Sequence, residues 1–217
     1  MPVLLLSIFA CVAIHLLTIA ATANAVGVRV RAVSLGMGPV LARFGRFQLR
    51  AVPLGGHVTL LDSRVEPVPK EAMPQAFDGR STAEQVAIAL SGCAALVAVA
   101  WGLLWTAGLE AIGAGVVQIL RGALSPFGQG QVLLADVVHF ARTAPVTVVF
   151  GCTAAKLAAL NLLPLPALNG GAALASVGRR LGLARWWPAG ATTGLSLVAL
   201  GIGISWCAAV VACAARG

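Results

Sequence analysis

The chain has 217 residues, of which 59% are hydrophobic and 10% are charged, and it contains no tyrosine. This composition excludes an ordinary soluble domain, in which about a quarter of the residues are charged. The net charge of +8 does not indicate nucleic-acid binding, because 11 of the 15 basic residues lie in two segments between apolar stretches.

Four apolar stretches are long enough to cross the hydrocarbon core of a bilayer, which takes about 20 residues in a helix. The sequence therefore predicts a mainly α-helical membrane protein with a single domain, 1–217. The predicted elements are helix 1 at about 3–24, a cytoplasmic or re-entrant β region at 25–84, helix 2 at about 85–107, an external loop at 108–145, helix 3 at about 146–165, a cytoplasmic loop at 166–188 and helix 4 at about 189–213.

Helix 1 ends in Ala21–Ala25, which imitates a signal-peptidase site. A signal peptide also carries a basic segment at its start, and no basic residue comes before Arg29. We therefore predict a membrane-spanning helix that contains His15. The β region that follows alternates β-prone runs with glycine turns, including Gly55 and Gly56.

Lys156 lies inside predicted helix 3, where insertion of a lysine costs about 2.5–3.5 kcal/mol. One hypothesis is that its ammonium group occupies a polar cavity within the helix bundle. The other is that it reaches the membrane surface or pairs with a partner subunit.

Helix 3 ends in a run of polar and helix-breaking residues. Pro164 and Pro166 remove backbone donors, so the helix should break near Leu163. Irregular backbone at membrane depth is tolerated only where protein or a water-filled cavity surrounds it. Asn161 and Asn169 are therefore expected to line an interior cavity together with His15.

The run from Asn161 to Gly170, N-x-x-P-x-P-x-L-N-G, resembles the N-x-x-P-x-P-x-L-D-G motif of the site-2 proteases, which are intramembrane zinc metalloproteases. Ser34–Pro39 and Pro53–Val58 resemble two further segments of that family, in the same order. The resemblance implies the four-helix site-2-protease core, with the β region as a membrane-associated sheet and re-entrant hairpin. That hairpin either pairs its edge with a substrate or partner, or only plugs the bundle.

The resemblance also implies a degenerate active site. In the family, helix 1 carries H-E-x-x-H, in which two histidines bind zinc and the glutamate activates water. The corresponding residues here are His15-Leu16-Leu17-Thr18-Ile19, and Asn169 stands where the family has its third ligand, an aspartate. We therefore expect no catalytic residue, no metal ligand and no cofactor.

The expected function is that of a pseudoenzyme related to site-2 proteases, which binds a transmembrane partner or serves as a subunit of a membrane complex. The residues expected to contact that partner are Asn161, Pro164, Pro166, Asn169, Gly55, Gly56 and Lys156. The loop at 108–145 is too short for the peptide-binding domain that the family often carries there. A divergent active protease that binds zinc, and a small transporter or channel subunit, remain the alternatives.

The basic residues predict the orientation in a bacterial inner membrane. Since positively charged loops stay in the cytoplasm, residues 25–84 should be cytoplasmic and both termini should lie outside. A cysteine introduced in place of Arg50 should then resist a membrane-impermeant thiol reagent applied to intact cells. Labelling from the outer face would contradict this orientation.

Overall fold

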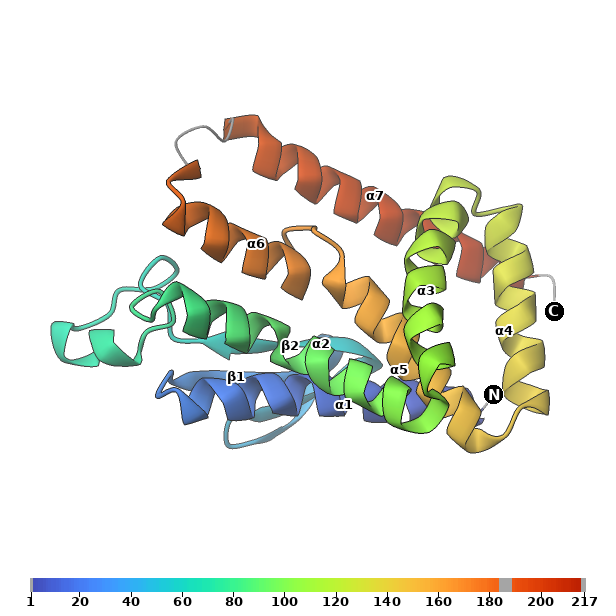
Figure 1. Cartoon of the computed structure of the whole chain (residues 1–217), viewed down its shortest axis with the longest axis horizontal. Helices are drawn as coiled ribbons and strands as arrows, with labels where there is room; N and C mark the ends of the chain where they lie inside the picture. The colour runs from blue at the N-terminus through green and yellow to red at the C-terminus, as the bar shows by residue number, and fades with distance from the viewer. Residues whose placement is uncertain (1, 184–188, 216–217) are drawn as a thin grey trace.

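The computed structural model describes residues 2–183 and 189–215, and this part of the chain is mainly helical with one two-stranded antiparallel sheet. Its elements, in chain order (Figure 1), are α1 (Pro2–Ala25), β1 (Val30–Phe44), β2 (Phe47–Leu60), the 3₁₀ helix η1 (Lys70–Gln75), α2 (Thr82–Leu104), α3 (Thr106–Leu124), α4 (Gln129–Thr143), α5 (Val146–Leu162), α6 (Asn169–Arg180) and α7 (Ala189–Ala214). The predicted helical membrane fold with a β region after the first helix is confirmed.

The core lies where α1, α2 and α5 pack against one another. The face that α5 presents to its neighbours consists largely of alanine, and Ala154, Ala155, Ala158 and Ala159 are fully buried. Small side chains let helix backbones approach closely, which is how helices gain packing contacts where lipid removes the hydrophobic drive. The short α5 is therefore covered on several sides.

Local sequence signals set the ends of two helices. Ser81 and Glu84 form a capping box, in which each side chain hydrogen-bonds to the other residue's backbone N–H, and α2 starts at the next residue after Ser81. Leu163 adopts an extended conformation ahead of Pro164, and α5 ends at Leu162. The predicted proline break is confirmed.

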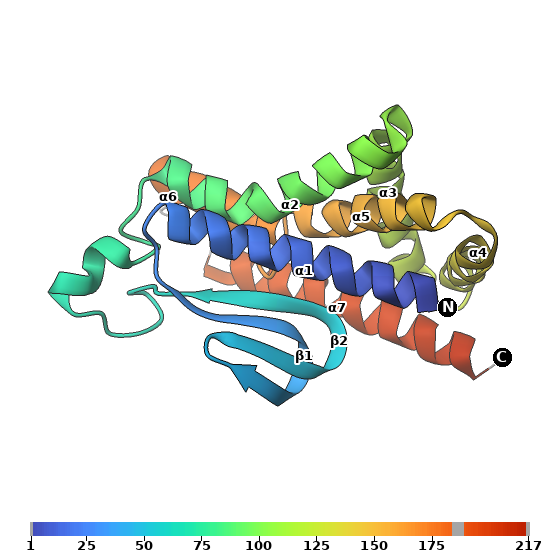
Figure 2. The ribbon, with the colours of Figure 1, turned by 90° about the horizontal axis from the view of Figure 1, so that it is seen from below.

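The hairpin of β1 and β2 runs back along α1 (Figure 2). The sheet curls, because Val33 pairs both with Val58 and with Phe47. Gly56 lies against the middle of α1: a Cβ there would stand 2.5 Å from Leu16 Cδ1. The hairpin therefore reaches the depth of a residue well inside a membrane-spanning helix, as expected for a re-entrant element.

Two segments that we expected as loops are helical. Residues 108–145 contain most of α3 and all of α4, and the loop at 166–188 contains α6, while its residues 184–188 lie outside the described part of the chain. By length and composition α3 could cross a membrane. Figures 1 and 2 show α3 and α4 running across the direction of α1 and α2, so these helices cannot all span one bilayer in the same way.

Three buried glycines, seven residues apart, hold α3 in this crosswise position. An added Cβ would stand 2.4 Å from the carbonyl oxygen of Ala100 at Gly108, 2.9 Å from Ala159 Cβ at Gly115 and 2.2 Å from the Trp206 ring at Gly122. The same face of α3 therefore receives α2, α5 and α7 in turn. The seven-residue spacing of these glycines is the signal for this helix in the sequence.

The last helix, α7, packs against α3 and α4. Trp206 Nε1 donates to the carbonyl of Ile119 at 3.0 Å, Gln131 Nε2 donates to that of Ala209 at 2.8 Å, and the Ser205 hydroxyl donates to that of Ala123. The first residues of α1 and the last residues of α7 lie at the same end of the molecule (Figure 1).

Replacing Gly122 by alanine should destabilise the protein, because the new methyl group would overlap the Trp206 ring. Overpacking of this kind costs about 1–3 kcal/mol, whereas alanine is otherwise the better helix former. The matched control is Gly113→Ala in the same helix, where a Cβ meets nothing within 4 Å. Thermal unfolding in detergent should show a lower midpoint for Gly122→Ala than for Gly113→Ala. Equal midpoints would contradict the packing of α7 on this glycine.

Candidate functional site

The first helix places His15, Leu16 and Ile19 in the interior. His15 is 5% exposed, and Leu16 and Ile19 belong to an apolar cluster that also contains Val33 of β1 and Ile88 of α2. Leu16, which the resemblance sets at the position of the family's glutamate, therefore contacts the hairpin and carries no acceptor for a proton. The position of the second histidine, Ile19, contributes only apolar packing.

Asn169 joins three helices at the start of α6. Its Nδ2 donates to the carbonyl of Ala89 in α2 at 2.6 Å, and its Oδ1 lies 3.2 Å from His15 Nε2 in α1. The Ala89 carbonyl is only an acceptor, which fixes the amide orientation and leaves Oδ1 facing the imidazole. Since Oδ1 is also an acceptor, His15 Nε2 must carry a proton in this arrangement. The expectation that His15 and Asn169 meet in the interior agrees with these contacts.

Gly92 of α2 closes the other side of the imidazole. A Cβ at Gly92 would stand 2.6 Å from His15 Nδ1, so only glycine leaves room for the ring. Nδ1 is buried, and it has no hydrogen-bond partner among residues 2–183 and 189–215. The imidazole is therefore held between a glycine and an amide, with one ring nitrogen engaged.

The turn between α5 and α6 brings Asn169 to this position. A Cβ at Gly170 would stand 2.3 Å from the carbonyl oxygen of Leu162, and one at Gly171 would stand 2.0 Å from that of Leu165. The two glycines after Asn169 thus let the first turn of α6 lie on the end of α5. Pro164 and Pro166 are exposed at the outside of this turn.

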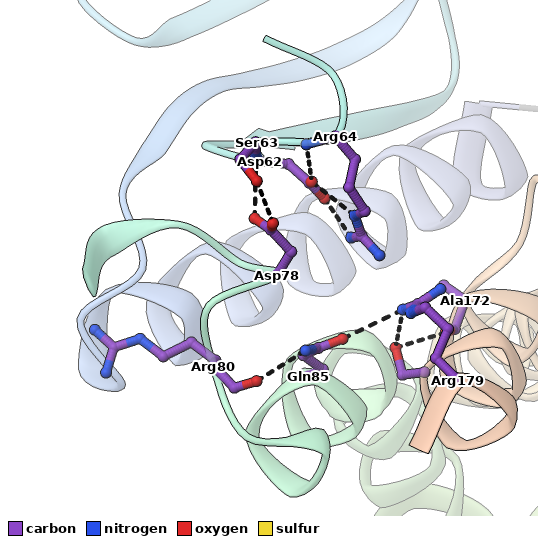
Figure 3. A network of polar contacts seen from close by, with 9 residues as sticks. Asp62, Ser63, Arg64, Asp78, Arg80, Gln85, Ala172 and Arg179 are labelled. Atoms are coloured by element: carbon purple, nitrogen blue, oxygen red, sulfur yellow. Dashed lines mark hydrogen bonds and ion pairs between the residues drawn. The ribbon is translucent and has the colours of Figure 1, made fainter. Parts of the chain in front are cut away.

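A polar network at the far end of α6 holds that helix against α2 (Figure 3). Arg179 donates to Gln85 Oε1 at 3.2 Å and to the Ser176 hydroxyl at 2.9 Å, and Gln85 Nε2 donates to the carbonyl of Arg80 at 2.8 Å. Contacts at both ends of α6 therefore hold it alongside α2 in the antiparallel direction, with Asn169 next to Ala89.

Beside this network, Asp78 accepts hydrogen bonds from the backbone N–H and the hydroxyl of Ser63 (Figure 3). Partial burial raises the pKa of Asp78, but these hydrogen bonds and the positive charge of Arg64 outweigh it, so the pKa lies below its usual value. The carboxylate is charged at neutral pH and ties the loop after β2 to the residues that precede α2.

Asn161 does not join the group around His15. Its Nδ2 donates to the carbonyl of Leu157, one turn back in its own helix, at 2.9 Å. No hydrogen bond connects Asn161 with His15 or Asn169 within the described ranges. The expectation that all three line one cavity therefore needs correction for Asn161, whose amide finds its acceptor locally because a helix carbonyl lies within reach.

Lys156 also lies elsewhere than expected. Its Nζ donates to the carbonyl of Ala111 in α3 at 3.1 Å, and its Cδ lies beside Gly115. The sequence left open a polar cavity within the bundle, the membrane surface or a partner subunit. The side chain does point to a neighbouring helix, but that helix is α3, which we had not predicted.

An apolar cavity of about 220 Å³ lies between α1 and the hairpin. Its lining includes Leu16, Leu17, Leu35, Phe44 and Phe47. Of the two glycines singled out in the sequence, Gly56 contacts Leu16, whereas Gly55 has nothing within 4 Å of an added Cβ.

These side chains do not fit the zinc ion that the family resemblance implies. A catalytic zinc takes three protein ligands and keeps one open position, and its water is activated by a nearby base. The residues here supply one imidazole and one neutral amide. Elsewhere in residues 2–183 and 189–215, no group of three or more His, Cys, Asp and Glu side chains could hold a metal ion.

Comparison with known proteins places these observations in a family context. A sequence model of "Peptidase family M50" matches residues 3–199. The Regulator of sigma-E protease RseP of Escherichia coli is 39% identical to the chain over 71 residues, and the Regulator of sigma E protease of Haemophilus influenzae is 37% identical over 71 residues. In both cases the match covers 30% of this chain and 16% of the relative.

Replacing Asn169 by aspartate should destabilise the protein. The change removes the donor to Ala89 and sets a carboxylate oxygen against that carbonyl, and an unsatisfied buried polar group costs about 1–3 kcal/mol. Asn24→Asp, at an exposed position near the end of α1, is the matched control. Chemical denaturation in detergent should show a loss for Asn169→Asp alone. A variant as stable as the wild type would mean that Asn169 does not bridge the helices.

Proposed function

Because the chain belongs to peptidase family M50, we propose that it is a catalytically degenerate member, which binds a transmembrane segment of another protein and does not cleave it. The chain aligns with 16% of the length of the proteases named above. Their activity is therefore not carried over as a whole, and the proposal rests on the site itself.

The hydrogen-bonded bridge from His15 through Asn169 to Ala89 carries this proposal. A metal would need the lone pair of His15 Nε2, which here faces Asn169 Oδ1 at 3.2 Å. The amide is fixed in turn by the Ala89 carbonyl. The first and third ligand positions of the family thus lie next to each other and hold helices together.

The apolar residues at the other two positions support the same conclusion. Leu16 and Ile19 are 4% and 8% exposed and pack against the hairpin and α2. Hydrolysis needs a base to take a proton from water, and Leu16 cannot do so. At these two positions, apolar packing of Leu16 and Ile19 takes the place of the polar active site that the resemblance implies, and it stabilises the fold.

The hairpin of β1 and β2 is the part of the chain suited to bind an extended segment. Strand addition at a sheet edge supplies backbone hydrogen bonds, and pockets for alternate side chains supply specificity. The hairpin offers both, since the cavity beside Leu16 lies between it and α1. Leu41 and Phe44 near its tip are 66% and 72% exposed. A transmembrane segment that unwinds next to α1 is the occupant this arrangement favours.

The four apolar helices and the family support a membrane protein. We place it in the bacterial inner membrane with both termini outside, as the basic residues indicate. A divergent active protease is the alternative that an experiment must separate from this proposal.

The wild-type protein, purified from membranes, should contain far less than one zinc per chain by elemental analysis, and it should leave transmembrane substrates intact. The triple variant Leu16→Glu, Ile19→His, Asn169→Asp restores the family's residues and serves as the positive control, because His15 Nε2 would then face a carboxylate and a second imidazole.

About one zinc per wild-type chain that disappears in His15→Ala would refute the proposal, as would cleavage that depends on His15. A triple variant that fails to fold does not weaken the test, because the zinc content of the wild type is measured independently.

A further inference from the structure

Lys156 is a cation in the short apolar helix α5, and no carboxylate among the described residues forms an ion pair with it. Its ammonium group donates to the carbonyl of Ala111, which already accepts the helical hydrogen bond of Gly115. No carboxylate lies within ion-pair distance of Lys156 in residues 2–183 and 189–215. An ammonium group has three donors, so two remain for another acceptor.

None of the chain's seven acidic residues lies in α5. They are Asp62, Glu66, Glu71, Asp78, Glu84, Glu110 and Asp136. Five of them come before or at the start of α2, and the remaining two lie in α3 and α4. The helices α1, α5, α6 and α7 carry none. Glu110 precedes Ala111 in α3, but it is exposed and forms no ion pair with Lys156.

The neighbouring helix α7 is largely uncovered on the same side of α3. Two glycines on one face of α3, Gly115 and Gly122, lie about 10.5 Å apart along its axis. Gly115 contacts Lys156, and Gly122 contacts Trp206 of α7. Figure 1 shows α7 extending from this contact beyond α3 and α4. Leu197 and Val198, which point about 100° apart, are 62% and 53% exposed. More than one face of this part of α7 is therefore free.

We propose that Lys156 recognises a transmembrane helix of another protein through an acidic side chain, and that this helix packs along the free part of α7. Apolar surface alone would suit lipid as well. The cation selects the occupant, because acyl chains cannot compensate an ammonium group at membrane depth, whereas a carboxylate in a partner helix can. This proposal rests on the proposed binding function and specifies the chemistry of the partner.

The test uses the full chain in phosphatidylcholine vesicles and synthetic single-span peptides of about 20 leucine and alanine residues. One peptide carries a single glutamate, placed in turn at several depths, and two matched peptides carry glutamine or leucine there. Energy transfer from the chain's tryptophans to a dansyl group on the peptide measures association.

At the matching depth, the glutamate peptide should bind about tenfold more tightly than the glutamine peptide. Lys156→Met should remove this preference, and Lys156→Arg should keep it. Lys70→Met is the matched control, because Lys70 is exposed, lies outside the membrane helices and is the chain's other lysine. Thermal unfolding of each variant shows whether it is folded.

Equal binding of the glutamate and glutamine peptides at every depth would overturn the proposal. A preference for the glutamate peptide that survives Lys156→Met would also overturn it. The same holds if Lys156→Met changes peptide binding only when anionic lipid is added, or if the chain associates with itself in a way that depends on Lys156. None of these outcomes changes the zinc content of the wild type, so failure here is distinct from failure of the proposed loss of catalysis.

Discussion

The amide of Asn169 is the contact on which the centre of this protein depends. It satisfies a carbonyl of α2 and a nitrogen of His15 in α1 while it begins α6. A neutral amide can do this because it has a donor and an acceptor in one plane. A carboxylate has only acceptors, and it would need a cation or a proton at the same place. An amide at this position therefore joins helices, where the family resemblance implies an aspartate.

A second constraint comes from α3, which lies across the other helices. Its glycine face brings α2, α5 and α7 onto one surface, and the short distances there leave no room for a side chain. This arrangement explains two features together. Lys156 finds a carbonyl in α3 because Gly115 lets the two helices approach, and α7 is held near one end while the rest of it stays exposed.

The two proposals concern separate parts of the molecule. The proposed loss of hydrolysis rests on Leu16 and Ile19 next to the hairpin, whereas the proposed partner helix rests on Lys156 and α7 on the side of α3. A membrane protein that keeps a protease scaffold without its chemistry can bind through both surfaces at once. Strand pairing at the hairpin would hold an unwound segment, and the lysine would set the depth of a helical one.

The sequence by itself determined the apolar helices, the break of α5 before Pro164 and the residues that stand in place of the family's zinc site. These are local properties, set by composition, by proline geometry and by motifs of fixed spacing. Only the tertiary structure decided that Asn169 contacts Ala89, that Asn161 bonds to its own helix and that Lys156 turns to α3. Each of these amide and ammonium groups can choose among several backbone carbonyls. The choice depends on how closely helices that are distant in sequence approach each other. The glycines at positions 92, 115 and 122 allow that close approach, but only once the helices are packed.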